Sequence, residues 1–578
     1  MRFTTFLSAL GLTSLSTARH APANSTFLNP VLPGWHSDPS CTRVDDTYYC
    51  ATSTFIAFPG LPVYASKDLI NWRLASHAWS RDSQLPGVSW NTWGQQDGMF
   101  APTLRHHDGE FFLICEYLGQ SSGSIGVVFR TRDPFDDDAW SDPVRFETDK
   151  IDPDLFWDDD GKVYVATQGI ILQEIDLETG EMSQPPVQLW NGSKGADTVW
   201  PEGPHIYKKD GWYYLLIAEG GTATNHAVTI ARAPAIDGPY EQYAANPILT
   251  NLGTSEYFQT VGHADLFTDT QGNWWGLALA TRSGPEWDIY PMGREAVMFP
   301  VTWEEGAWPV CEPVRGRMSG WHLRPPSRDV PGDKPFNADP DFYAFTGEDA
   351  RIPAHFMHWR VPREGSFTTT PRGLRVVPSR ANLTGQIEHD NLSGRRGLSF
   401  VGRRQTDTIF RFSVDLTFDP DDANQEAGVT MFLTQYAHVD LAVQRTGSGA
   451  RQLRFHAVGN GAPELTELSD LPDDLAGAET VRLWVRAVSP TLFELAVGGT
   501  EDGDEGVVVG SASAKLLSGG TGSFVGSLVG VYATCNGNGD GEECPDGGDA
   551  YFTNWRYTPI AQFISANESV PADVHPRP

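Results

Sequence analysis

Five copies of one short pattern constrain the fold of this chain more than any other feature. Each copy joins an apolar run to an aromatic run through a turn, mostly of Asp and Gly. Asp-Gly between two apolar runs predicts a β-hairpin. A repeat of roughly 50 to 60 residues has room for the four short strands of a propeller blade. We therefore predict an all-β, five-bladed β-propeller within residues 19–321. The turns with their aromatic runs are residues 44–49, 107–112, 159–164, 209–213 and 270–275.

An ionisable residue stands at the same place before the aromatic run in four of the five copies. In a propeller this place begins the innermost strand, beside the central channel. Turn chemistry is the alternative explanation for the two Asp-Pro pairs. Three carboxylates in register favour a functional site at one mouth of the channel instead. In chain order the five residues are Asp38, Ala101, Asp152, Glu202 and His263.

The pattern changes after the propeller. Residues 322–350 are rich in Pro, Asp and Gly and are predicted to be a linker. Apolar and polar residues then alternate, as in 410–418 and 481–486. This alternation is typical of half-buried antiparallel strands and predicts a β-sandwich over 351–561. Residues 562–578 are predicted to form a loose tail.

The N-terminus predicts secretion. A positive charge at position 2, an apolar run and small residues at 16–18 indicate a signal peptide over residues 1–18. No later stretch is long and apolar enough to cross a membrane. In an extracellular protein, acceptor sequons are candidate glycosylation sites. They stand at Asn24, Asn191, Asn382, Asn391 and Asn567.

The six cysteines suggest structural roles, because none has the spacing of metal ligands. Cys41 and Cys50 flank the first turn and could form a disulfide. Cys535 and Cys544 could close a loop rich in Gly and Asp. The remaining two, at 115 and 311, are expected to be buried thiols, although they could pair with each other.

The net charge of −32 disfavours nucleic acid and anionic membranes as partners and favours a neutral substrate. Paired carboxylates in a secreted, aromatic-rich protein point to glycoside hydrolysis, in which one carboxyl group protonates the leaving oxygen and another activates water or acts as nucleophile. Metal binding is the alternative chemistry for these acids. No short-range ligand cluster supports it, so no metal site is expected.

Residues 30–40, 151–156 and 200–205 resemble the three acid motifs of glycoside hydrolase family 43. Segments 402–405 and 425–428 resemble the C-terminal sandwich of its two-domain members. The resemblance implies an inverting mechanism with Asp38 as general base, Asp152 as modulator of the acid's pKa and Glu202 as general acid. It implies pocket roles for Phe55, Phe100, His263 and Arg294. It implies no required cofactor, with room for a structural ion near His263.

Within that family, the chain resembles secreted fungal arabinofuranosidases that act on arabinoxylan, through segments 55–60, 254–260 and 526–532. This resemblance implies the release of α-L-arabinofuranosyl side chains from a plant cell-wall polysaccharide, including the O3-linked arabinose of doubly substituted xylose. An exo-acting β-xylosidase on xylo-oligosaccharides is the alternative. A non-catalytic carbohydrate-binding propeller is a third hypothesis. It is disfavoured because all three carboxylates are present.

Overall fold

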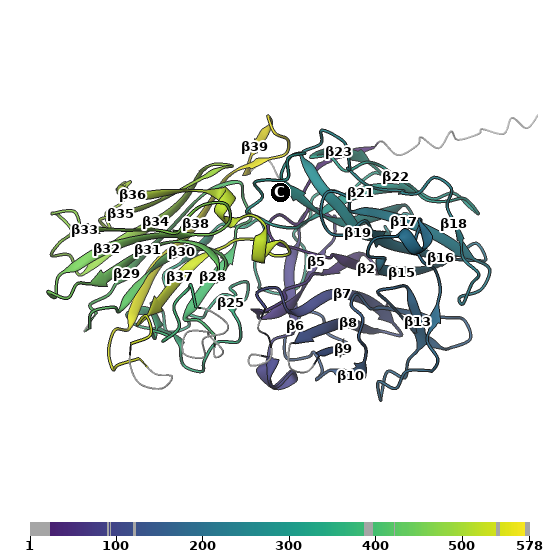
Figure 1. Ribbon diagram of the computed structural model, residues 1–578, viewed down its shortest axis with the longest axis horizontal. Helices are drawn as coiled ribbons and strands as arrows, with labels where there is room; N and C mark the ends of the chain where they lie inside the picture. The colour runs from purple at the N-terminus through teal and green to yellow at the C-terminus, as the bar shows by residue number, and fades with distance from the viewer. Residues whose placement is uncertain are drawn as a thin grey trace, which may run out of the picture.

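The computed structural model describes residues 24–572, except 89–91, 93, 120–122, 386–396, 421 and 539–543. Two β domains lie side by side, a propeller and a sandwich, which confirms the predicted fold class (Figure 1). The predicted signal peptide and the sequon at Asn391 lie outside the described residues. No helix in the described part of the chain has the length and apolarity that a membrane crossing requires.

The propeller consists of five four-stranded antiparallel sheets, and four of them are built from consecutive strands. The first blade skips β4 (Ala57–Phe58), which pairs outside the propeller. The Asp-Gly turns form because both central residues adopt positive φ, as at Asp108 (49°) and Gly109 (77°), which suits a tight hairpin. The blades are β2 (Ser40–Val44), β3 (Thr47–Ala51), β5 (Gly60–Ser66) and β6 (Arg73–Trp79); β7 (Gly98–His107), β8 (Glu110–Gly119), β9 (Gly123–Thr131) and β10 (Val144–Glu147); β11 (Asp154–Trp157), β12 (Val163–Thr167), β13 (Ile171–Glu174) and β14 (Val187–Gln188); β15 (Glu202–Lys209), β16 (Trp212–Glu219), β17 (Ala227–Ala233) and β18 (Glu241–Gln242); and β19 (Phe258–Thr268), β20 (Trp274–Arg282), β21 (Glu295–Thr302) and β22 (Val310–Cys311).

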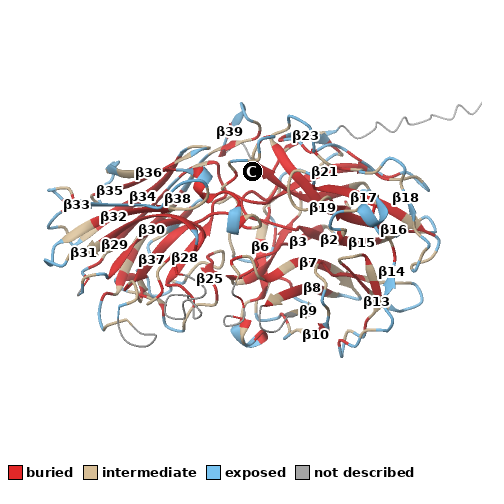
Figure 2. Ribbon diagram, viewed as in Figure 1, coloured by how far each residue is buried: buried red, intermediate tan, exposed pale blue. Residues whose placement is uncertain are grey.

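The ends of the propeller are tied together by a separate strand pair, β1 (Ser25–Leu28) with β23 (Arg317–Gly320). Buried residues run through the strands of both domains, while exposed residues gather in the peripheral loops (Figure 2). Short 3-10 turns complete the described secondary structure: η1 (Asp82–Gln84), η2 (Gly195–Asp197), η3 (Ala514–Leu517) and η4 (Gly520–Gly522).

The sandwich packs a nine-stranded sheet against a six-stranded sheet. The alternation seen in the sequence sets its core, because Phe410, Phe412 and Val414 are fully buried while Arg411 between them is exposed. The first sheet contains β26 (Phe367–Thr370), β27 (Gly373–Val376), β38 (Ala550–Phe563), β29 (Ile409–Thr417), β34 (Thr480–Ser489), β35 (Leu492–Gly498) and β36 (Val507–Ser513), with β24 (Asp341–Tyr343) and β39 (Ser569–Pro571) beside β38. The second contains β28 (Phe400–Arg404), β37 (Leu528–Thr534), β30 (Glu426–Thr434), β31 (Ala437–Arg445), β32 (Arg451–Val458) and β33 (Leu465–Asp470).

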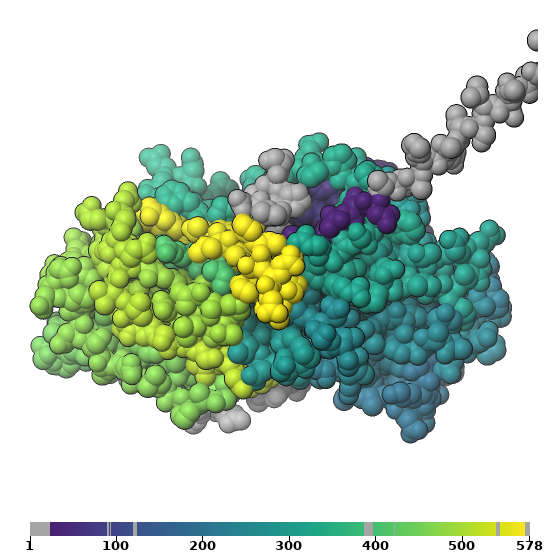
Figure 3. Space-filling model, turned by 90° about the horizontal axis from the view of Figure 1, so that it is seen from above, coloured from purple at the N-terminus to yellow at the C-terminus, as the bar shows by residue number. Residues whose placement is uncertain are grey.

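Two of the predicted boundaries need correction. The predicted linker 322–350 contains β24, which is a strand of the sandwich sheet because it pairs with β38. The predicted tail 562–578 is not loose at its start, because β38 runs to Phe563 and β39 pairs with it. In the space-filling view the C-terminal segment lies over the boundary between the domains (Figure 3). The domains also share a strand pair, β4 (Ala57–Phe58) with β25 (His358–Trp359).

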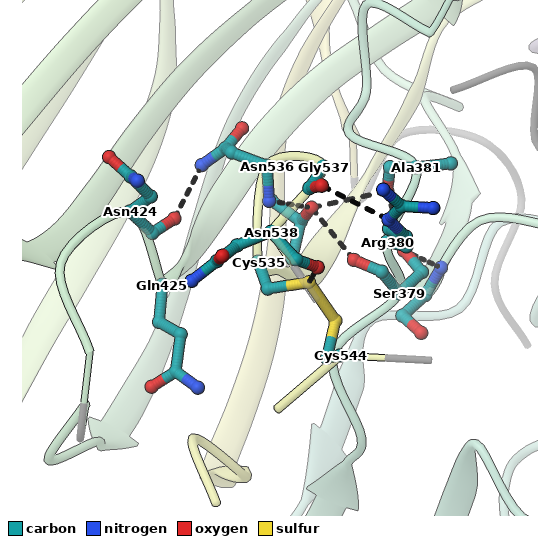
Figure 4. The surroundings of a disulfide bond; sticks show 12 residues. Ser379, Arg380, Ala381, Asn424, Gln425, Cys535, Asn536, Gly537, Asn538 and Cys544 are labelled. Atoms are coloured by element: carbon teal, nitrogen blue, oxygen red, sulfur yellow. Dashed lines mark hydrogen bonds between the residues drawn. A yellow bond between two sulfur atoms is a disulfide. The ribbon is translucent and has the colours of Figure 1, made fainter. Parts of the chain in front are cut away.

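Both candidate disulfides are present. Cys41 and Cys50 are register partners on β2 and β3. Cys535, bonded to Cys544, donates its backbone N–H to the carbonyl of Ser379 at 3.0 Å, which fastens the loop to a neighbouring segment (Figure 4). The other two cysteines, Cys115 and Cys311, are free and buried.

Three sequons are exposed, at Asn24, Asn191 and Asn567. Asn382 is half-buried, and its amide nitrogen donates to Oδ1 of Asn536 at 3.2 Å. That nitrogen is the atom to which a glycan would be attached, so this side chain would have to turn outward to be modified. Use of the sequons stays a prediction.

Candidate active site

The backbone at the start of each innermost strand has the left-handed conformation, with positive φ, at or next to one aligned residue in each blade. Asp38, Ala101, Asp152 and His263 have φ of 52°, 33°, 58° and 49°. In the fourth blade Gly203, next to Glu202, takes this conformation with φ 54°. Left-handed backbone is costly for residues other than Gly and is concentrated at functional sites. Bulges follow in the second, fourth and fifth blades, and a bulge re-aims side chains.

Asp38 is held by three neighbours. Ser53 donates its hydroxyl to Oδ2 of Asp38 at 2.6 Å and accepts the N–H of Ala101 at 2.8 Å. The other oxygen, Oδ1, lies 3.4 Å from Nη1 of Arg294 and 3.6 Å from Nδ1 of His263. Burial lowers the pKa of His263 to about 4, so the ring is a neutral neighbour of this carboxyl group.

Asp152 and Glu202 lie in neighbouring blades and both favour the protonated form. The N–H of Gly203 donates to Oδ2 of Asp152 at 3.0 Å, and Gln168 donates to Glu202 at 3.4 Å. Burial raises the pKa of Asp152 well above its usual range, and the charges of Glu202 and Asp38 add to this. Burial also raises the pKa of Glu202 to about 7, although the positive charge of Arg294 opposes the shift.

Gly203 has no room for a side chain. A Cβ at this position would lie 3.0 Å from Nε2 of His263, and its φ is positive. Gly203, directly after Glu202, therefore has two roles: its N–H donates to Asp152, and its lack of a side chain lets the His263 ring approach.

Three phenylalanine rings line one side of the cluster, and one comes from the sandwich. The ring centroids of Phe55 and Phe100 are 4.9 Å apart, edge to face. Phe524, between η4 and β37, lies 6.0 Å from Phe55 and 6.5 Å from Phe100. Its ring also lies 4.2 Å from the guanidinium carbon of Arg294. Its carbonyl accepts the hydroxyl of Ser37 at 2.6 Å, one residue before Asp38. The sandwich thus completes the wall of the site.

One layer further along the channel, a guanidinium occupies the centre. Asp154 at the start of β11 and Asp265 on β19 stand two residues after Asp152 and His263. Arg105 makes ion pairs with Asp154 at 2.7 Å and Asp265 at 2.8 Å. Arg105 already neutralises these two carboxylates, so the residues of this layer do not fit a divalent ion.

The structure thus brings together all seven residues predicted for the site: Asp38, Asp152, Glu202, Phe55, Phe100, His263 and Arg294. Sequence reasoning missed three others, Gln168, Arg105 and Phe524, and gave no role to Ser53, which begins the segment 53–55 that resembles a pocket loop of the family. Arg105 carried a signal, since the polar residues at 154 and 265 follow the aligned positions by two and require a buried cation. Phe524 carried none, because it belongs to another domain.

Comparison with known proteins agrees with this geometry. Residues 27–309 match the model of "Glycosyl hydrolases family 43", and residues 345–558 match the "Beta xylosidase C-terminal Concanavalin A-like domain". A non-reducing end α-L-arabinofuranosidase of Bacteroides ovatus is 34% identical over 543 residues, covering 91% of this chain and 94% of the relative. A xylosidase/arabinosidase of Humicola insolens is 31% identical, covering 88% of this chain and 94% of the relative.

Solved structures extend the likeness to both domains. The structure "Bacteroides ovatus Xyloglucan PUL GH43B" superposes with a TM-score of 0.80 at 30% identity, covering 93% of this chain and 100% of the other. A xylan β-1,4-xylosidase of Bacillus halodurans superposes with a TM-score of 0.77 at 28% identity, covering 92% and 100%. This chain is therefore a glycosidase that belongs to glycoside hydrolase family 43.

Proposed function

We propose that this chain is an extracellular exo-acting α-L-arabinofuranosidase that removes arabinofuranosyl side chains from arabinoxylan. The observation that carries the proposal is the pair Asp38 and Glu202, two buried carboxyl groups in different surroundings beside a wall that Phe524 closes. A site walled by both domains suits a terminal sugar better than the middle of a polymer. The choice of sugar is supported by the relative named as a non-reducing end α-L-arabinofuranosidase.

The proposed mechanism is single displacement with inversion. Asp38 takes a proton from water, while Glu202 protonates the oxygen of the departing sugar. A pKa of about 7 suits Glu202 to the acid role, because a useful acid is still partly protonated near neutral pH. Asp152 lies beside both groups and is proposed to set the ionisation of the acid. No cofactor enters the proposal.

A second candidate is an exo-acting β-xylosidase on xylo-oligosaccharides. Two relatives support it: the Humicola insolens protein is named a xylosidase/arabinosidase, and the Bacillus halodurans structure is named a xylan β-1,4-xylosidase. The two sugars differ in ring size, so the fit of one ring between Arg294 and the phenylalanine wall decides between them.

The deciding experiment compares kcat/KM on aryl α-L-arabinofuranoside and aryl β-D-xyloside. We expect the arabinofuranoside to be preferred and the released sugar to have the opposite anomeric configuration by NMR. NMR of treated arabinoxylan then shows which linkages disappear; loss of O3-linked arabinose from doubly substituted xylose is expected. A higher kcat/KM on the xyloside would replace the first candidate with the second.

Phe524→Ala is expected to raise KM by roughly 5- to 30-fold with little change in kcat. The substitution removes an aromatic wall and the cation–π contact with Arg294, a loss of about 1–2 kcal/mol. Steady-state kinetics on the preferred aryl glycoside measures it. Phe342→Ala is the matched control, because Phe342 is a sandwich phenylalanine that is 62% exposed. An unchanged KM would remove Phe524 from the substrate wall.

A further inference from the structure

Two strands of the sandwich bring two histidines and a carboxyl group together, away from the propeller. His438 and Asp440 are two residues apart on β31, so their side chains lie on one face of the sheet. His456 on β32 is the register partner of Asp440. The possible ligand atoms of the three side chains all lie within 4.8 Å of one another. All three residues are buried, with exposures of 0%, 0% and 4%.

Several polar atoms of this cluster lack a hydrogen-bond partner within the described part of the chain. They are Oδ1 of Asp440, Nε2 of His456 and Oγ1 of Thr430, the register partner of Asp440 on β30. An unsatisfied buried polar atom is destabilising, and three in one cross-strand row point to a missing ligand.

The remaining polar atoms of the three side chains are fixed by neighbours. Nδ1 of His456 contacts the hydroxyl of Thr466 at 2.9 Å, which leaves Nε2 as the available atom. His438 contacts Asp440 through Nδ1 at 2.7 Å and Thr384 through Nε2 at 3.1 Å. The His438–Asp440 contact alone would be an ordinary buried pair. It does not account for the free atoms on Asp440 and His456.

The surrounding charges favour a cation. Arg454 lies 4.0 Å from Asp440, but Glu426 binds it through both oxygens at 2.6 and 2.7 Å. That pair is neutral as a unit, so Asp440 keeps its negative charge. Glu464 adds another, with its carboxylate 3.8 Å from Nε2 of His456.

We propose that His438, Asp440 and His456 bind one divalent transition-metal ion of the zinc type. Imidazole nitrogens with one carboxylate suit zinc, whereas Ca²⁺ and Mg²⁺ prefer oxygen ligands throughout. Nδ1 of His438 would give up its contact with Asp440 and coordinate the ion instead. Glu464 lies at the open side of the cluster, beside His456. Thr466 would orient His456 from the outer shell. The ion would tie β31 to β32 and stabilise the sandwich. The sequence alone does not point to this cluster, because only strand pairing brings His456 to Asp440.

The test uses the full chain, stripped with a chelator, incubated with excess ZnCl₂ and separated from free metal by gel filtration. Elemental analysis is expected to find one zinc per chain, and the thermal midpoint of the sandwich is expected to rise. Asp440→Asn and His456→Gln are expected to weaken binding by more than the roughly 10- to 100-fold that loss of an outer-shell partner costs. His322→Gln, at an exposed histidine, is the control and should bind like the parent.

Co²⁺ loading gives a second readout, because a tetrahedral nitrogen and oxygen site produces visible absorption that the two ligand variants should lack. Hydrolysis of an aryl glycoside reports folding of the propeller in each variant, and near-UV circular dichroism reports packing of the whole chain. If the folded parent retains no zinc, or if both ligand variants retain as much as the parent, the site does not exist.

Discussion

Asp38→Asn is expected to lower kcat by roughly 100- to 10,000-fold on every substrate, because an amide cannot take a proton from water. The fold should survive, since the amide oxygen can still accept the hydroxyl of Ser53. The measurement is kcat on an aryl glycoside and on arabinoxylan, with the thermal midpoint recorded for the same preparation. Sugar binding, followed by calorimetry, should be kept.

The control for this variant is Asp45→Asn, in the same blade. Asp45 is exposed at the turn between β2 and β3 and also has positive φ, so its substitution tests the chemistry of the change without touching the site. Its activity should equal that of the parent. If Asp38→Asn matched the parent at equal enzyme concentration, Asp38 would not be the base.

The propeller and its carboxylates could be predicted because they are local features repeated along the chain. Each blade places one residue at the start of its inner strand, so Asp38, Asp152, Glu202 and His263 fall in register before any contact is known. Closing the blades into a ring then brings them together. The left-handed backbone at these positions was not predictable, because Asp and His seldom adopt positive φ, whereas Gly adopts it readily.

The rest of the site depends on contacts between segments far apart in the sequence. Phe524 reaches the wall only because the sandwich docks on the propeller, where Gly293 and Gly526 leave room for the opposing backbone. A Cβ on Gly293 would lie 2.1 Å from the carbonyl oxygen of Val525. Composition shows the linker region as rich in Pro and Gly, but it cannot show that β24 pairs with β38. The two predicted boundaries that needed correction, those of the linker and of the tail, depend on strand pairing and not on local sequence pattern.

The pH profile offers a check on Glu202. A general acid works in its protonated form, so the rate on sugar leaving groups should fall as pH rises through the pKa of Glu202, about 7. In the proposed mechanism this basic limb reports the ionisation of the acid. It should be absent from Glu202→Gln, whose amide does not titrate. A basic limb that persists unchanged in that variant would belong to another group.

Glu202→Gln is expected to lower kcat on arabinoxylan by roughly 100- to 10,000-fold and to leave much more activity on aryl glycosides with acidic phenols. A sugar alkoxide needs a proton in order to leave, whereas an activated phenolate hardly does. In the proposed mechanism Asp38 must still activate water in both reactions, so Asp38→Asn should lose both activities. The measurement is a series of aryl glycosides of decreasing phenol acidity, with log kcat plotted against phenol pKa for parent and variant. The variant should show the steeper dependence.

If Glu202→Gln damages good and poor leaving groups equally, Glu202 does not protonate the leaving oxygen. Asp152, whose pKa is raised well above its usual range by burial and by Glu202, would then take the acid role.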